Sequence, residues 1–121
     1  MSKLSTIQKR NNLNEVCRGK WGEYDENDFH SYTIFHDENG IDTHTEIRFQ
    51  NGPRGVEGSV GGVLDGDLLE IVRDRLTHFQ QGELRNRETA CALTHIEEAL
   101  MWLNKRAEDR AERGVLGTYN K

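Results

Sequence analysis

The segment between Asn86 and Gly114 has the pattern of one long amphipathic helix. Asn86 suits an N-cap, and Gly114 is the residue type found just past a helix C-terminus. At about 1.5 Å per residue such a helix spans roughly 40 Å, which is long for so small a chain. Its apolar residues recur three and four positions apart and share one face: Leu93, Ile96, Leu100, Leu103 and Ala107. We therefore expect this face to pack partly against another subunit of an oligomer.

A second stripe on the same helix is basic. Projected at about 100° per residue, its members fall within roughly 80° of one another: Trp102, Arg106, Arg110 and Arg113. Arg106 and Arg110 are like charges one turn apart, which mildly destabilises an isolated helix and becomes favourable when an anion bridges them. The alternative is a solvated face on which Asp109 pairs with Arg106 and Arg113.

The composition predicts a single domain, residues 1–121, with a modest core. Of 121 residues, 34% are hydrophobic and 31% are charged, and the formal net charge is -5. This negative charge argues against binding to long nucleic acid, which needs a broad basic surface. It does not exclude a small anion, because a few arginines that converge on one pocket can hold phosphates.

The cysteine count and the absence of long apolar runs bear on compartment. Cys17 and Cys91 are too few for a disulfide framework, and Cys91 lies in the helix pattern, where we expect a small buried thiol. No stretch approaches the roughly 18 consecutive apolar residues of a membrane span, and the N-terminus lacks the apolar run of a signal peptide. We expect a cytoplasmic protein with no membrane partner.

A β-hairpin is predicted in the N-terminal third. Residues 41–50 alternate between apolar and polar side chains, as in a half-buried antiparallel strand. Residues 29–36 are the expected partner strand, joined through Asn39-Gly40, which suits a two-residue type I′ turn. Residues 1–20 are compatible with a short helix, a strand or partial disorder.

The register of this hairpin follows from the turn. It places Tyr32 and Ile34 opposite Ile47 and Thr45 on one apolar face. It also places Asp37 opposite Asp42, so a longer loop remains an alternative. His30, His36 and His44 lie in the hairpin, but His36 and His44 would point to opposite faces. We therefore expect no metal site.

A helical hairpin is predicted in the C-terminal half. A first helix begins near Asp65 or Asp67, either of which can cap it, and runs to about Gln81, with Gly82 as its stop. The short link to the long helix makes the two helices antiparallel neighbours.

The predicted class is therefore α+β. An N-terminal antiparallel sheet and a glycine-rich connection occupy residues 1–64. The antiparallel two-helix hairpin, residues 65–121, follows and oligomerises.

Phe79 lies near the junction of the two predicted helices, close to Arg87 and Thr89. An aromatic ring beside an arginine and a hydroxyl suits a nucleobase, because stacking is worth about 1 to 3 kcal/mol per base. The alternative is that Phe79 is simply the last core residue of its helix.

Several segments of the chain resemble the phage anti-Thoeris proteins. They are FQNGP, LLEIVRDRLTHFQQG, RETACALTHIEEALMWLNKR and RGVLGT. The resemblance is dense over residues 49–118 and covers the N-terminal third in general plan. These proteins share a helical-hairpin domain with the phage anti-CBASS sponges. The resemblance implies an N-terminal antiparallel sheet, a C-terminal helical hairpin, and a homodimer, in many cases assembled as a trimer of dimers.

The resemblance also implies a function and site residues. Members bind glycocyclic ADP-ribose (gcADPR), the product of bacterial TIR-domain immune enzymes, and hold it without degrading it in the infected host. The family's adenine-stacking aromatic matches Phe79, and its phosphate- and ribose-binding arginines match Arg106 and Arg110. Thr89 stands where asparagine is common and is a shorter group with one donor.

A second ligand is implied for some members of the family. They capture cyclic trinucleotides, and in some cases dinucleotides, at a separate site of the hexamer. Arg54 and Arg87 match positions associated with that oligonucleotide site. Trp21 is the first of the N-terminal aromatics that can close the gcADPR pocket.

Three rival functions follow from the residues. A signal-cleaving enzyme needs a nucleophile and a base, but no such pair has suggestive spacing, and Glu97 and Glu98 point about 100° apart on a helix. A small phage DNA-binding regulator would use Arg106, Arg110 and Arg113, but the net charge opposes it. A purely structural hairpin is the third alternative. We expect no catalytic residue and no cofactor.

Overall fold

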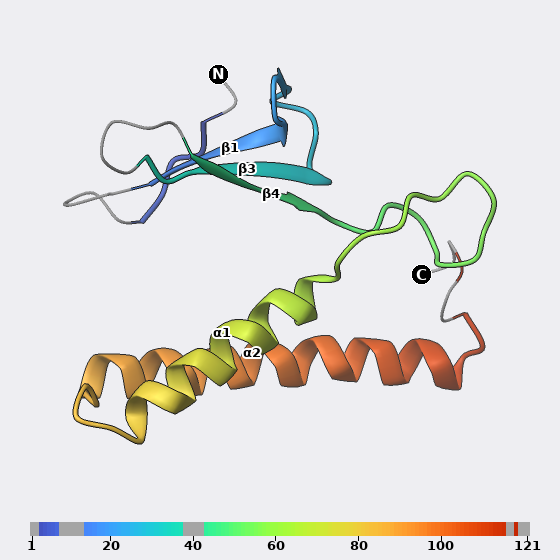
Figure 1. Cartoon of the computed structure of the whole chain (residues 1–121). Coiled ribbons are helices and arrows are strands. Elements are labelled where there is room, and N and C mark those ends of the chain that lie inside the picture. Colours follow the sequence, from blue (N-terminus) through green and yellow to red (C-terminus); the bar gives the residue numbers. More distant parts are fainter. Residues whose placement is uncertain (1–2, 8–13, 38–42, 116–117, 119–121) are drawn as a thin grey trace. The chain divides into compact units, whose positions relative to one another are not determined.

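The computed structural model describes residues 3–7, 14–37, 43–115 and 118, and this part of the chain contains four strands followed by two helices (Figure 1). The elements are β1 (Glu15–Lys20), β2 (Glu23–Tyr24), β3 (Ser31–Phe35), β4 (His44–Arg48), α1 (Asp65–Gln80) and α2 (Arg87–Glu112). The predicted α+β class is confirmed. The chain divides into two compact units, Met1–Asn51 and Gly52–Lys121. None of the described helices is long and apolar enough to cross a membrane.

The first unit is built on an antiparallel sheet with strand order β2-β1-β3-β4. The predicted hairpin register is confirmed, because Tyr32 pairs with Ile47 and Ile34 pairs with Thr45. The turn at Asn39-Gly40 lies outside the described residues. The segment that the sequence left open contains β1, which pairs with β3 through residues 15–18.

The most buried side chains of the sheet are small. Thr33 and Ser31 are 0% and 3% exposed, and Cys17 is 9% exposed. The Thr33 hydroxyl donates to the Gly19 carbonyl at 3.0 Å, which satisfies a polar group that burial would otherwise penalise. Gly19 has φ +104°, and a Cβ there would lie 2.7 Å from the backbone of Asp25. Only glycine therefore allows β2 to fold back so closely on β1.

Aromatic rings cluster beside these buried residues. The Trp21 and His44 rings stack with centroids 4.1 Å apart and planes at 7°. The Phe35 ring lies 5.7 Å from Trp21, and the Tyr24 ring lies 5.9 Å from Phe35. The Trp21 backbone N–H donates to the Glu46 carboxylate at 3.4 Å. Packing within the sheet thus accounts for the contacts of this aromatic cluster.

Two histidines of the hairpin, His36 and His44, make structural contacts through their rings. His36 bonds through its ring to the hydroxyls of Thr45 and Thr43, at 2.9 and 3.0 Å, whereas His44 stacks on Trp21. Among the described residues, no group of three or more His, Cys, Asp and Glu side chains could hold a metal ion.

The second unit contains the predicted helical hairpin. α2 begins after Asn86, whose side chain accepts the Thr89 N–H at 2.7 Å, and ends just before Gly114 at φ +72°. The Gln80 side-chain amide ties the helices together, because it donates to the Asn86 carbonyl and accepts the Asn86 N–H, both at 3.0 Å. The expected caps of the long helix are confirmed.

The expected cap of the first helix needs a correction. Leu64, rather than Asp65 or Asp67, occupies the N-cap position of α1. Asp67 is the third residue of the helix, and its carboxylate reaches back to accept the Leu64 N–H at 2.8 Å. This is one half of a capping box, so α1 begins one residue earlier than an Asp65 cap, and three residues earlier than an Asp67 cap, would place it.

The hairpin leaves much apolar surface exposed. Neither helix contains a buried residue. Met101 and Trp102 are each 69% exposed, and Ile71 is 63% exposed. Cys91 is also exposed, so the predicted buried thiol is wrong. The physical reason is that two packed helices shield only one stripe of each other, and Cys91 is not shielded by α1.

Candidate functional site

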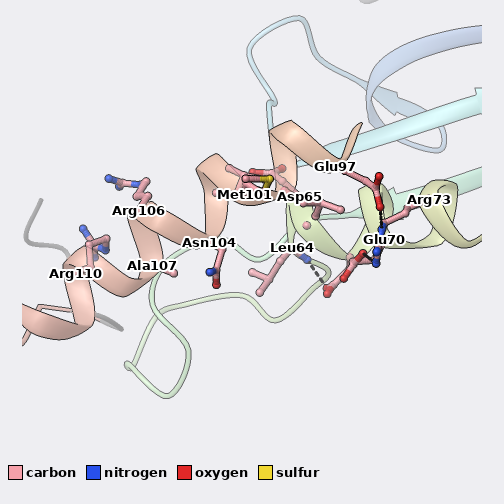
Figure 2. Close-up of a pocket in the computed structure, with 14 residues that line it drawn as sticks. Leu64, Asp65, Glu70, Arg73, Glu97, Met101, Asn104, Arg106, Ala107 and Arg110 are labelled. Carbon is pink, nitrogen blue, oxygen red and sulfur yellow. Dashed lines mark hydrogen bonds and ion pairs between the residues drawn. The ribbon is translucent and has the colours of Figure 1, made fainter. Parts of the chain in front are cut away.

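A groove of about 920 Å³ lies between the beginning of α1 and the C-terminal half of α2 (Figure 2). Its apolar lining is Leu64, Leu100, Met101, Leu103 and Ala107, and its polar lining is Asp65, Asp67, Glu70, Arg73, Glu97, Asn104, Arg106 and Arg110. Gly66 completes it, and a Cβ added there would lie 3.9 Å from the Leu100 side chain. Small ligands and cofactors generally occupy clefts of about 300 to 1,000 Å³.

Arg106 and Arg110 project from successive turns of α2 at one end of this groove (Figure 2). Arg106 is exposed, and it has no ion-pair partner among the residues that the structure describes. Asp109 pairs with Lys105 at 3.3 Å, rather than with Arg106 or Arg113 as the solvated-face alternative requires. The guanidinium of Arg106 is therefore not neutralised by its own helix.

Arg110 is held differently from Arg106. It is half-buried, and its Nη2 donates to the backbone carbonyls of Val115 and Thr118 at 3.1 and 2.9 Å. The residues just after α2 therefore orient this guanidinium. Arg106 and Arg110 thus differ in exposure and in hydrogen bonding.

The α1 side of the groove carries an ionic cluster. Arg73 bonds to the Glu97 carboxylate at 2.8 Å and to the Glu70 carboxylate at 3.4 Å (Figure 2). The hydrogen bond to Glu97 is the main reason why the pKa of Arg73 is raised, and Glu70 adds to the effect. Because Glu97 belongs to α2, the cluster links the two helices and leaves carboxylates along this wall.

Phe79 and Thr89 lie at the other end of the hairpin, near the loop that joins α1 to α2. The guanidinium carbon of Arg75 lies 4.9 Å from the centroid of the Phe79 ring, and the His78 ring meets Phe79 edge-on at 5.5 Å. Phe79 is half-buried, so it is not a fully buried core residue. Thr89 is also half-buried. Its backbone N–H donates to the Asn86 side chain, which caps α2.

The predicted gcADPR residues therefore form two pairs. Thr89 and Arg106 are separated by about five turns of α2, which corresponds to roughly 26 Å along the helix axis. One chain brings Phe79 and Thr89 to one end of the hairpin and Arg106 and Arg110 to the other. A single small ligand cannot contact both pairs within one chain.

Arg54 and Arg87 are also separated. Arg54 lies in the glycine-rich segment before α1, where its side chain donates to the Gly62 carbonyl at 3.5 Å. Arg87 is the first residue of α2, at the loop end of the hairpin. α1 lies between these two positions in the chain, and its sixteen residues span about 24 Å.

Part of the groove lining was missed by sequence reasoning. The pairing of Arg73 with Glu97 depends on how α1 is aligned along α2, which helical periodicity does not specify. The carbonyls of Val115 and Thr118 that hold Arg110 are backbone groups, so no residue type signals them. Arg73 could have been suspected from the acidic side chains on the facing stretch of the long helix.

Two comparisons with known proteins agree with this architecture. Residues 41–108, more than half of the chain, match the family described as "Acb2/Tad1, hairpin domain". Over 75 residues, 62% of this chain and 52% of the relative, the sequence is 49% identical to "Thoeris anti-defense 1" of Bacillus phage SBSphiJ7. The chain spans about half the length of this curated relative. The matched family region includes β4, α1 and most of α2, so this chain belongs to the Acb2/Tad1 hairpin-domain family.

Proposed function

We propose that this protein is a phage anti-defence sponge. It binds glycocyclic ADP-ribose immune signals and sequesters them without degrading them, so that the host effector is not activated. Membership of the hairpin-domain family and the name of the similar phage protein, "Thoeris anti-defense 1", support an anti-defence role. The observation that carries the ligand class is the pair of arginines, Arg106 and Arg110, in the groove.

The chemistry of these arginines suits a diphosphate. Side chains one helical turn apart have Cβ atoms about 5 to 6 Å apart, so two guanidinium groups can grip neighbouring phosphates. Arg106 can donate two parallel hydrogen bonds to one phosphate, which fixes orientation as well as charge, and Arg110 adds its positive charge one turn away. The exposed, unneutralised guanidinium of Arg106 is suited to this role, and the apolar lining beside it lowers the local dielectric.

Two copies of the chain complete the site in this proposal. The separation of roughly 26 Å between Thr89 and Arg106 along α2 exceeds the reach of one small cyclic nucleotide. A two-fold dimer with antiparallel hairpins sets the loop end of one copy beside the arginine end of the other. The exposed apolar side chains of α2, Met101 and Trp102, supply surface for such an interface.

Phe79 is the proposed base-binding residue. One face of its ring is already covered by Arg75, at 4.9 Å. An adenine that stacks on the other face would make a layered arrangement of base, ring and guanidinium, and each layer is favourable. Thr89 offers one hydroxyl for a hydrogen bond to the bound nucleotide.

The mechanism is mass action. The sponge lowers the concentration of free signal below what its receptor needs, so it requires tight binding and enough copies but no chemical step. A ligand of roughly 35 non-hydrogen atoms at about 0.3 kcal/mol per atom gains about 10 kcal/mol, a dissociation constant of tens of nanomolar.

A second binding site for cyclic trinucleotides or dinucleotides is part of the proposal. Arg54 lies in the segment before α1, and Arg87 begins α2 at the loop end of the hairpin. In this proposal different copies contribute them, as in a trimer of dimers.

Equilibrium titration with each gcADPR isomer tests the proposal, with linear ADP-ribose as the control. Nanomolar binding of at least one isomer, and weaker binding of the linear compound, is the expected result. The alternatives give other outcomes. A DNA-binding regulator would bind long DNA with steep salt dependence, and a signal-cleaving enzyme would turn the isomer over during the titration.

A further inference from the structure

The end of α2 is built as a specific turn. The Gly114 N–H donates to the Ala111 carbonyl at 3.1 Å, and the Val115 N–H donates to the Arg110 carbonyl at 2.9 Å. These two bonds, with Gly114 at φ +72°, define a Schellman motif. The motif reverses the chain immediately after the helix.

This reversal directs backbone carbonyls at Arg110. Val115 accepts from Nη2 of Arg110 at 3.1 Å, and Thr118 accepts from the same nitrogen at 2.9 Å. The Thr118 N–H in turn donates to the Val115 carbonyl at 3.1 Å. Arg110 is thus tied to the turn through both its main chain and its side chain.

We propose that this C-terminal turn is a positioning device for Arg110, with Gly114 as the positioning residue. The proposal rests on the proposed function, in which Arg110 binds phosphate. An arginine that is oriented before the ligand arrives loses less side-chain freedom when it binds. Arg106, one turn earlier, is exposed and has no ion-pair partner among the described residues. Of these two arginines, only Arg110 is held by the turn.

Gly114 allows a test that does not disturb packing. A Cβ added at Gly114 would meet nothing within 4 Å, so only the backbone conformation resists substitution. Valine is strongly disfavoured at positive φ because it is β-branched, whereas asparagine adopts this conformation more readily than most residues. G114V therefore disrupts the turn, and G114N is the matched control.

The first measurement uses the protein without ligand. NMR of the Arg110 guanidinium reports rotation about its Cζ–Nη bonds, which hydrogen bonds from Nη2 slow. We expect slow rotation in the wild type and in G114N, and faster rotation in G114V. Equal rotation in all three would overturn the positioning role. This readout is independent of whether the protein binds gcADPR.

The second measurement is a double-mutant cycle on affinity for the gcADPR isomer that the wild type binds most tightly. We expect G114V to weaken binding about three- to tenfold, the range that ordering one long side chain costs, and G114N to bind like the wild type. In an R110A background, G114V should cause no further loss, because the turn acts through Arg110. The same loss in both backgrounds would overturn the inference. A wild type that binds no isomer would instead refute the proposed function.

Discussion

Arg106 and Phe79 are the side chains on which capture should depend most. We predict that R106A or F79A reduces gcADPR binding below detection. R106A removes the charge that binds phosphate, and F79A removes the ring that stacks on the base. Titration calorimetry measures the loss, and sedimentation velocity should show an unchanged oligomer. K105A is the control. Lys105 is the basic residue next to Arg106, but it pairs with Asp109. Unchanged affinity in both variants would refute the site assignment.

At the residue scale, the sequence was informative where a side chain's role follows from position on one helix. Arg106 and Arg110 could be placed on one face from spacing alone, and both line the groove. The solvated-face alternative paired Asp109 with Arg106 and Arg113, but its partner is Lys105; all three cations are within reach and their interaction energies are small. The Arg73 contact to Glu97 joins two helices, and no local pattern encodes it.

At the element scale, the loop end of the hairpin depends on the α2 N-cap. Asn86 accepts the Thr89 N–H at 2.7 Å and donates to the Leu84 carbonyl at 3.1 Å. We predict that N86A lowers the free energy of unfolding by about 1 kcal/mol, the usual value of such a cap. Urea denaturation measures the change. N86D should retain most of the stability, because its carboxylate can accept the same N–H.

A result in which N86A and the wild type unfold at the same denaturant concentration would contradict this role of the cap. N86A leaves the bonds between the Gln80 side-chain amide and the Asn86 backbone in place, so the change tests the Asn86 side chain alone.

Helix ends were predicted better than strands, for a physical reason. Asn86 and Gly114 act on their own helix within a few residues, so their effect is visible in the sequence. β1 was left open because it is defined by pairing with β3, far along the chain. The buried hydrogen bond between β1 and β3 joins Thr33 to Gly19, and neither residue type is typical of a core. The start of α1 near Asp65 was predicted, but its N-cap was assigned to the wrong residue because Asp67 caps from inside the helix.

At the scale of the whole molecule, the account requires two chains for each gcADPR site. We predict that F79A and R106A, each unable to bind alone, recover binding when they are mixed. A mixed dimer has one site that carries both defects and one site that carries neither. Random exchange then restores about one quarter of the sites. Stoichiometric titration of the mixture after subunit exchange measures this fraction.

A site formed within one chain predicts no recovery in the mixture. Mixing F79A with F79A,R106A is the control, because every site in that mixture lacks Phe79. Recovery there would show that mixing itself, rather than complementary sites in a mixed dimer, restores binding.

The proposed division of the gcADPR site between two chains could be anticipated only in part from the sequence. The spacing of Thr89 and Arg106 along one predicted helix already implies their separation, whereas the position of Phe79 relative to them depends on how α1 is aligned along α2. The sequence did indicate that the hairpin needs a partner, since its apolar stripe was long. Met101 and Trp102 are exposed on the hairpin, and the partner stays a prediction.

The most direct test of the central claim is recovery of the ligand after capture. The purified protein is incubated with each gcADPR isomer, bound and free ligand are separated, and the protein is denatured and its ligand chromatographed. The account predicts depletion of at least one isomer and release of that isomer intact. Release of an altered product would contradict sequestration and indicate an enzyme, and depletion of no isomer would contradict gcADPR as the ligand.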